Sequence, residues 1–146
     1  MNGRPLLDVC YTVFMVDAYK HRRHAVYVLN YHFVWIPRRR RRVLVGEVAT
    51  RLDALIREKA EELEMDVVEL AIQPDHLHLF VSASPDWAPN QIAHRLKGYT
   101  ARMLRQEFPA LVKMPSMWTD AFFVSTAGRV SAETIQRYIA AQSTRA

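Results

Sequence analysis

The fold of this chain is decided by one stretch, Gln73-Pro74-Asp75-His76-Leu77-His78-Leu79-Phe80-Val81-Ser82. Its residues predict a buried strand, in which successive side chains point to opposite faces of a sheet. His76 and His78 therefore share one face, and Leu77, Leu79 and Val81 share the other. A shift of one residue would expose three aliphatic side chains to water, so the aliphatic residues determine which way the histidines face.

Two histidines at positions i and i+2 of a rigid strand can offer two nitrogens to one metal ion, because imidazole is the commonest protein metal ligand. The alternative is a pair of half-buried histidines that are satisfied by hydrogen bonds. For His76 and His78 alone, both interpretations stay open.

The end of the chain bears on this choice. Residues 131–142 predict a terminal helix, with Ser131 or Thr134 as its N-terminal signal and apolar residues at helical spacing. Tyr138 and Gln142 lie four residues apart and share one face of that helix. The pair combines a candidate nucleophile with an amide oxygen that could bind a metal, against the alternative of a half-buried tyrosine and a surface glutamine.

Taken together, these residues resemble the single-tyrosine HUH transposases of the IS200/IS605 insertion sequences. The resemblance covers residues 25–146. It rests on His76-Leu77-His78, on Tyr138 with Gln142, and on Tyr31-His32-Phe33-Val34-Trp35, Leu96-Lys97-Gly98 and Trp118. One departure is that the family usually has a tyrosine where this chain has Phe122 or Phe123.

The resemblance implies a metal-dependent DNA strand transferase that cleaves and rejoins the single-stranded ends of an insertion sequence. Tyr138 would be the catalytic nucleophile, which forms a 5′-phosphotyrosine and leaves a free 3′-OH. His76, His78 and Gln142 would bind Mg²⁺ or Mn²⁺. The DNA partner would carry hairpins at the element ends. The resemblance also implies a homodimer in which the tyrosine of one subunit acts with the histidines of the other, although the sequence alone permits either docking.

Two other functions remain as alternatives. A replication initiator or relaxase would share the metal and tyrosine chemistry, but a small chain with one candidate tyrosine fits a transposase better. A noncatalytic module of RRM-like fold would bind single-stranded nucleic acid with the same sheet and the same basic surfaces. Replacement of Tyr138 would remove an activity only from an enzyme.

The predicted elements follow one another as strand, helix, strand, strand, helix and strand. They cover residues 25–36, 46–65, 66–72, 73–82, 90–108 and 118–124, with Asn90 as the cap of the second helix. This order predicts an α+β, ferredoxin-like/RRM-like split βαβ fold: a four-stranded antiparallel sheet, two helices on one face, and the tyrosine-bearing C-terminal helix. The histidines are then expected to look out from the open face.

The strand over 25–36 has two unlike faces. Tyr27, Tyr31, Phe33 and Trp35 lie on one face, where aromatic side chains either form core or stack on bases. His32 lies on the other face, either in a structural role or near the metal site.

Composition limits the remaining possibilities. The chain has 146 residues, half of them apolar, which suits one domain over 25–146 behind an N-terminal arm, residues 1–24, of unknown role. The single cysteine, Cys10, excludes an internal disulfide framework and fits the cytoplasm. The apolar patch at 9–16 is too short to cross a bilayer, so no membrane partner is expected.

The net charge of +5 favours a polyanionic partner. Five consecutive arginines follow the strand that ends near Pro37 and predict a solvated loop that contacts phosphates. The helix over 90–108 carries a second basic surface. The predicted DNA-binding residues are Arg38, Arg39, Arg40, Arg41, Arg42, Arg95 and Lys97.

Overall fold

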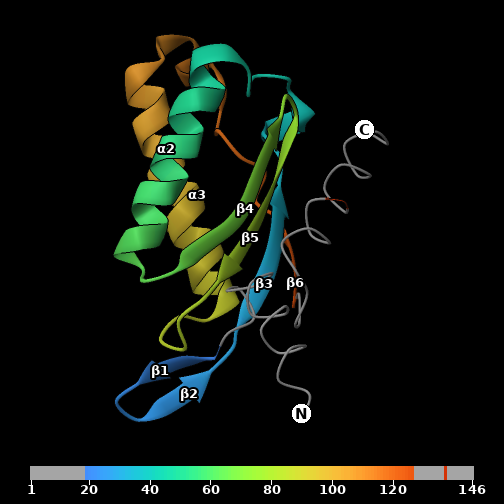
Figure 1. The fold of residues 1–146 in the computed structure, drawn as a ribbon. Coiled ribbons are helices and arrows are strands. Elements are labelled where there is room, and N and C mark those ends of the chain that lie inside the picture. Colours follow the sequence, from blue (N-terminus) through green and yellow to red (C-terminus); the bar gives the residue numbers. More distant parts are fainter. Residues whose placement is uncertain (1–18, 127–136, 138–146) are drawn as a thin grey trace.

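The computed structural model describes residues 19–126 and Arg137. Its strands are β1 (Lys20–Arg22), β2 (Ala25–Tyr27), β3 (Asn30–Trp35), β4 (Asp66–Gln73), β5 (His76–Ser82) and β6 (Phe123–Thr126). Its helices are α2 (Gly46–Glu62), α3 (Pro89–Glu107) and the 3-10 helices η2 (Arg38–Arg40) and η3 (Pro109–Lys113). The main sheet is antiparallel with the order β4-β5-β3-β6, and α2 and α3 lie on one of its faces (Figure 1). The predicted α+β fold is confirmed, whereas the predicted tyrosine-bearing helix lies outside the described residues.

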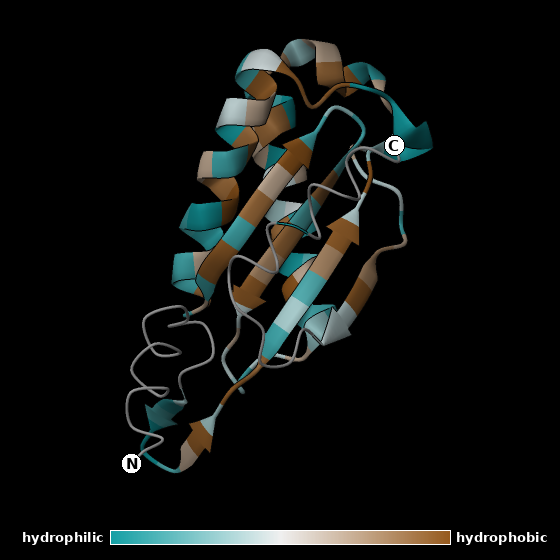
Figure 2. Ribbon diagram, turned by 45° about the vertical axis from the view of Figure 1, so that its right-hand side comes forward, coloured by the Kyte–Doolittle hydropathy of each residue, from teal (hydrophilic) through white to brown (hydrophobic). Residues whose placement is uncertain are grey.

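The hydrophobic core lies between the sheet and the two helices. Leu77, Leu79 and Val81 of β5 are at most 1% exposed and belong to it, as predicted. Phe33 and Trp35 of β3 are also buried there, so these two aromatic side chains form core and are not open to bases. The helices contribute Leu52, Leu55, Ile56 and Ala60 from α2, and Ile92, Ala93, Leu96 and Leu104 from α3. The alternation of hydrophobic and hydrophilic residues along the strands is visible in Figure 2.

The hairpin of β4 and β5 has the predicted tight connection at residues 74–75. Its antiparallel register pairs Gln73 with His76 and Ala71 with His78, with an irregularity between Val67 and Glu69. Strand β5 lies between β4 and β3, and all seven of its residues are buried. The histidines lie on the face of the sheet away from the helices, as expected. The expectation that they are exposed on this face is wrong, because both side chains are buried.

The predicted strand over 25–36 is not continuous. It is interrupted after Tyr27, and β2 pairs with β1 in a separate two-stranded sheet that extends beyond the main one (Figure 1). Ion pairs connect this hairpin to the body of the domain: Lys20 contacts Asp66, and Arg22 contacts Glu64 and Asp86. The expected boundary between the N-terminal arm and the domain, at residues 24 and 25, falls in the turn of this hairpin.

Two further element boundaries differ from those predicted. Helix α3 begins at Pro89 after the N-cap residue Ala88, whose backbone N–H donates to Oε1 of Gln91 at 2.8 Å, so Asn90 is not the cap. The last strand of the sheet is Phe123–Thr126 rather than 118–124. Trp118 instead forms an isolated bridge with Pro37, and its indole N–H donates to Oγ1 of Thr100 at 3.1 Å.

Within residues 19–126, no helix combines the length and the apolar character that a membrane crossing requires.

Candidate functional site

Three histidines from two neighbouring strands form the centre of the candidate site. His76 and His78 come from β5, and His32 comes from β3, which is paired with β5. Nε2 of His32 and Nδ1 of His78 lie 3.0 Å apart and share a hydrogen bond, and the His32 ring stacks on Phe80 with the centroids 4.1 Å apart. The rings of His76 and His78 are nearly perpendicular, with centroids 5.2 Å apart. His32 therefore contacts the predicted metal-binding pair directly. The sequence held a partial signal for this, because the alternation of strand 25–36 puts His32 opposite the core face.

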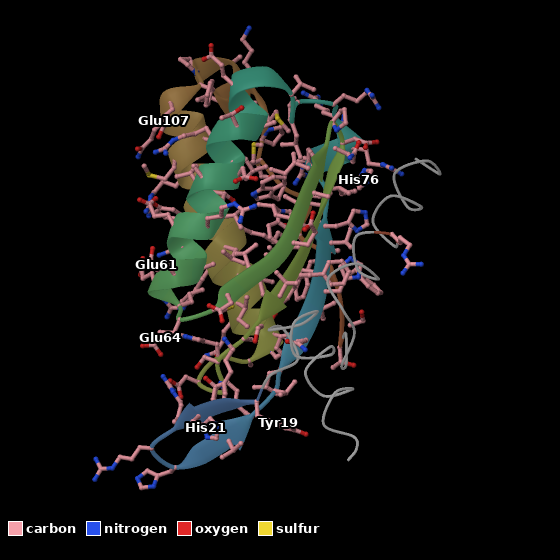
Figure 3. All side chains as sticks on the ribbon, in the orientation of Figure 1. Tyr19, His21, Glu61, Glu64, His76 and Glu107 are labelled. Atoms are coloured by element: carbon pink, nitrogen blue, oxygen red, sulfur yellow. The ribbon has the colours of Figure 1, made fainter. Side chains whose placement is uncertain are left out.

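His76 is held by a carboxylate that the sequence prediction did not assign. Its Nδ1 atom lies 2.8 Å from Oδ1 of Asp75, and Nη2 of Arg40 lies 3.2 Å from Oδ2 of the same residue. The hydrogen bond from His76 and the nearby charge of Arg40 lower the pKa of Asp75, so that Asp75 is ionised at neutral pH. An ionised carboxylate only accepts hydrogen bonds. His76 therefore carries its proton on Nδ1 when it is neutral, and its Nε2 atom has a free lone pair. Figure 3 shows His76 on the side of the sheet away from α2 and α3.

The other two rings are neutral at pH 7. Burial lowers the pKa of His32 and the pKa of His78 to about 4, with a smaller contribution from the neighbouring histidine in each case. The Nε2 atom of His78 is buried and has no hydrogen-bond partner among the described residues. A buried polar atom without a partner is costly and is rare in folded proteins.

These observations fit a divalent cation at His76 and His78. The Nδ1 atom of each ring is already held by another residue, as is typical of ligating histidines, and this leaves the Nε2 atom of each ring to face a cation. Across residues 19–126, no three His, Cys, Asp or Glu side chains are grouped to hold a metal by themselves. The pair would thus need other donors. The predicted third ligand, Gln142, and the predicted nucleophile, Tyr138, both lie outside the described residues.

The lowered pKa values predict a loss of stability in acid. In the unfolded chain His32 and His78 would titrate near 6.5, but in the folded chain near 4. Between these values the unfolded chain binds more protons, so the free energy of unfolding decreases as the pH falls from 6.5 to 4. We expect the Tm in EDTA, followed by circular dichroism, to fall across this window, and to fall less in the His32→Gln variant. An equal fall in both proteins would contradict the shift at His32.

The five arginines after β3 do not share one environment. Arg38 donates from Nη1 to Oγ of Ser116 at 3.0 Å, and Arg40 contacts Asp75. Arg39, Arg41 and Arg42 are exposed and make no ion pair within the described part of the chain. The predicted solvated loop is thus partly a short 3-10 turn, and three of its five guanidinium groups remain open to a phosphate backbone.

The predicted basic surface of α3 is partly used within the domain. Lys97 Nζ donates to the carbonyl oxygens of Thr119, Asp120 and Ala121 at 2.7, 3.2 and 3.1 Å, and burial lowers its pKa. Arg105 likewise donates to backbone carbonyls, those of Val112 and Met114. Arg95 is exposed and lies over the ring of Trp87, 4.4 Å from its centroid. Lys97 therefore holds the segment before β6, while Arg95 stays accessible.

The two phenylalanines at the departure from the family pattern occupy different faces. Phe122 packs toward the core, with its ring centroid 6.2 Å from that of Phe33. Phe123 is half exposed and meets His32 edge-on, with centroids 5.8 Å apart. Phe123 is thus the one that adjoins the histidine cluster, and it brings no hydroxyl there.

The comparisons with known proteins agree with one another. Residues 25–142 match the family described as "Transposase IS200 like", a span that contains the histidine pair, Tyr138 and Gln142. The chain is 33% identical over 135 residues to the ISDra2 transposase TnpA of Deinococcus radiodurans, covering 90% of this chain and 96% of the relative.

Two solved structures share the fold. The crystal structure of a candidate transposase from Deinococcus radiodurans superposes with a TM-score of 0.70 at 35% identity, covering 84% of this chain and 97% of that one. The structure of a REP-associated tyrosine transposase bound to a REP hairpin superposes with a TM-score of 0.50 at 15% identity, covering 81% of this chain and 67% of that one.

Proposed function

Because the chain belongs to the family of IS200-like transposases, we propose that it cleaves and rejoins the single-stranded DNA ends of an insertion sequence with Tyr138 as nucleophile. The observation that carries this proposal is the histidine pair, in which the buried Nε2 of His78 lacks a partner among the described residues. A metal ligand role would give this atom a partner, whereas a noncatalytic nucleic-acid-binding sheet would leave it without one.

His76 and His78 would hold a divalent cation, Mg²⁺ or Mn²⁺, through their Nε2 atoms, together with the side-chain oxygen of Gln142. When bound, such a cation offsets charge on a scissile phosphate and orients it for in-line attack. The neutral state of His78 at pH 7 supports this role, since a protonated ring could not be a ligand.

Tyr138 would carry the covalent step. Its phenol has an ordinary pKa of about 10, so it loses its proton as it attacks. The bond from the tyrosine oxygen to phosphorus forms while the bond from phosphorus to the 3′ oxygen breaks. The products are a 5′-phosphotyrosine and a strand that ends in a 3′-OH. The ester preserves the bond energy, so the 3′-OH of another strand can attack it and join without a nucleotide cofactor.

The DNA partner is proposed to be single-stranded, with hairpins at the element ends. The REP-associated relative was solved with a REP hairpin, and the exposed arginines of this chain suit a phosphate backbone. The reaction would take place in the cytoplasm. A chain with a single cysteine, Cys10, forms no internal disulfide, which fits that reducing compartment.

DNA binding should depend strongly on salt, because each phosphate that an arginine neutralises releases counterions. For single strands the slope of log affinity against log salt is about −0.7 for each phosphate contact. We expect the double variant Arg41→Gln, Arg42→Gln to reduce the magnitude of this slope by about 1.4, measured by fluorescence anisotropy. The double variant Arg23→Gln, Arg57→Gln removes the same charge elsewhere and serves as the control. Equal slopes in the two double variants would exclude the arginine loop from the interface.

The direct test of the proposed function is a covalent adduct. Incubation of the protein with Mg²⁺ and single-stranded element-end DNA should yield a protein–DNA species that survives denaturing electrophoresis. Mass spectrometry should locate the nucleotide on Tyr138. The Tyr138→Phe variant lacks the attacking oxygen, so it should form no adduct while it still binds the DNA. An adduct of undiminished yield in that variant would refute Tyr138 as the nucleophile.

We further propose that the protein acts as a homodimer, with Tyr138 and Gln142 of one subunit at the His76 and His78 of the other. The support is the sequence that follows β6, where Gly128 lies between the end of that strand at Thr126 and the helix predicted over residues 131–142. An element on such a joint can be exchanged between identical subunits with few new contacts.

A further inference from the structure

Each histidine of the pair is held by a different residue, and in both cases the atom that is held is Nδ1. Asp75 contacts Nδ1 of His76 at 2.8 Å, and His32 contacts Nδ1 of His78 at 3.0 Å. We propose that Asp75 and His32 are positioning residues that fix both rings with an unprotonated Nε2, an inference that rests on the metal-dependent function proposed above. Neither residue would touch the metal itself.

Asp75 determines the tautomer of His76. The carboxylate can only accept, so the shared proton is on Nδ1 of His76 and the lone pair is on Nε2. The side chain of Asp75 is 14% exposed, which leaves little room for water to replace this contact. Asp75 directly precedes His76, the first residue of β5, so the contact joins two neighbouring residues at the start of the strand.

Arg40 holds Asp75 from the other side. Its guanidinium lies 3.2 Å from the second carboxylate oxygen, which leaves the first oxygen for His76. The backbone accepts an unfavourable conformation here, since Arg39 and Arg40 have φ angles of 60° and 53°, in the left-handed region that side chains disfavour. One member of the arginine run thus serves the metal site, whereas its neighbours Arg41 and Arg42 stay exposed.

His32 plays the corresponding part for His78. Its ring is 4% exposed and lies parallel to Phe80, with an interplanar angle of 3°, so its orientation is fixed by packing. When the His32 proton is on Nδ1, its Nε2 accepts the Nδ1 proton of His78. This arrangement leaves the lone pair of His78 on Nε2, the buried atom for which the described residues offer no donor.

The first experiment measures tautomers and metal affinity in the DNA-free protein. In long-range ¹H–¹⁵N spectra recorded in EDTA, His76 and His78 should both carry their protons on Nδ1. Titration with Mn²⁺, followed by the electron paramagnetic resonance of free Mn²⁺, should show a site that His76→Ala removes. The Asp75→Asn variant should raise the Kd about tenfold or more, as is usual when the partner of a ligating histidine is lost.

The outcomes separate the two levels of the proposal. A wild-type protein with no Mn²⁺ site would overturn both the metal-dependent function and the positioning roles. A site that His76→Ala removes but Asp75→Asn leaves at wild-type affinity would overturn the role of Asp75 alone. A His78 ring protonated on Nε2 would overturn the role of His32.

A second experiment distinguishes positioning by His32 from simple packing. His32→Phe keeps a ring on Phe80 but loses the acceptor, whereas His32→Gln loses the ring and keeps a polar atom that can bond to His78. Positioning predicts that His32→Phe raises the Kd for Mn²⁺ about tenfold and that His32→Gln stays closer to wild type. A purely structural role predicts the reverse order.

A third comparison tests Arg40 against its neighbour Arg41. Arg40→Gln should weaken Mn²⁺ binding by roughly two- to fivefold, a modest effect because its guanidinium is half exposed. Arg41→Gln should leave Mn²⁺ binding unchanged and weaken binding of single-stranded DNA in EDTA more than Arg40→Gln does. If Arg40→Gln weakens only DNA binding, Arg40 belongs to the DNA interface and not to the metal site.

Discussion

Replacement of His78 by alanine is expected to lower the rate of single-stranded DNA cleavage by roughly a thousandfold or more, because loss of a metal ligand removes several kcal/mol of transition-state stabilisation. The assay is cleavage of labelled element-end DNA at limiting Mg²⁺. His78 is the more informative of the two histidines, since its Nε2 atom, unlike any nitrogen of His76, is buried without a hydrogen-bond partner among the described residues. Cleavage at the wild-type rate under these conditions would exclude His78 as a ligand.

Because His78 is buried, the His78→Ala variant will also be less stable than the wild-type protein. Its cleavage rate must therefore be compared with that of a control variant of similar stability. The ring is 4% exposed, so alanine leaves a cavity and takes away the partner of His32. We expect a loss of about 2–3 kcal/mol in the free energy of unfolding, as for other large-to-small changes in a core. Val81→Ala is a suitable control, because Val81 is buried in the same strand on the opposite face. That variant should be less stable but should still cleave well below its Tm.

Mixed dimers are expected to recover cleavage from two inactive subunits. His76→Ala lacks a ligand and Tyr138→Phe lacks the nucleophile, so each homodimer should be inactive. If the terminal helix acts on the neighbouring subunit, the mixed dimer has one complete site, with the histidines of the tyrosine variant and the tyrosine of the histidine variant. Purified mixed dimers, selected with two different affinity tags, should reach about half the wild-type rate, since one of two sites is intact.

The mixed dimer also has a clear negative outcome. If the helix docks on its own subunit, every site in the mixed dimer lacks one group and the purified species stays inactive. A wild-type dimer that carries the same two tags provides the control for purification. Loss of activity in the mixed dimer alone would show docking within one subunit.

The elements that were predicted correctly are those whose signal is local. Helices α2 and α3 follow from apolar residues at helical spacing, and the β4–β5 hairpin follows from the short connection at residues 74–75. Periodicity reports which face of an element is buried, and such a signal does not depend on distant partners. For the same reason, the sequence alone predicts that Leu77, Leu79 and Val81 belong to the core, as they do in the structure.

The element boundaries that were predicted wrongly are those that depend on partners elsewhere in the chain. A β-rich composition runs through residues 25–36, but β2 ends at Tyr27 because it pairs with β1, while β3 pairs with β5 and β6. Trp118 has the character of a strand residue, yet it packs in the core and bonds to Thr100. Where a strand begins and ends depends on its neighbours in the sheet, and composition does not identify those neighbours.

The sequence by itself determined that His76 and His78 share one face of a strand, because alternation along a strand is a property of the backbone. Only the tertiary structure decided that this face is buried and that His32 and Arg40 reach it, since these contacts join residues more than thirty positions apart. It likewise decided that Lys97 holds three backbone carbonyls instead of standing free for DNA. The sequence gives the charge and type of each residue. The partner of each charged or polar group depends on which strands and loops lie next to one another in the folded protein.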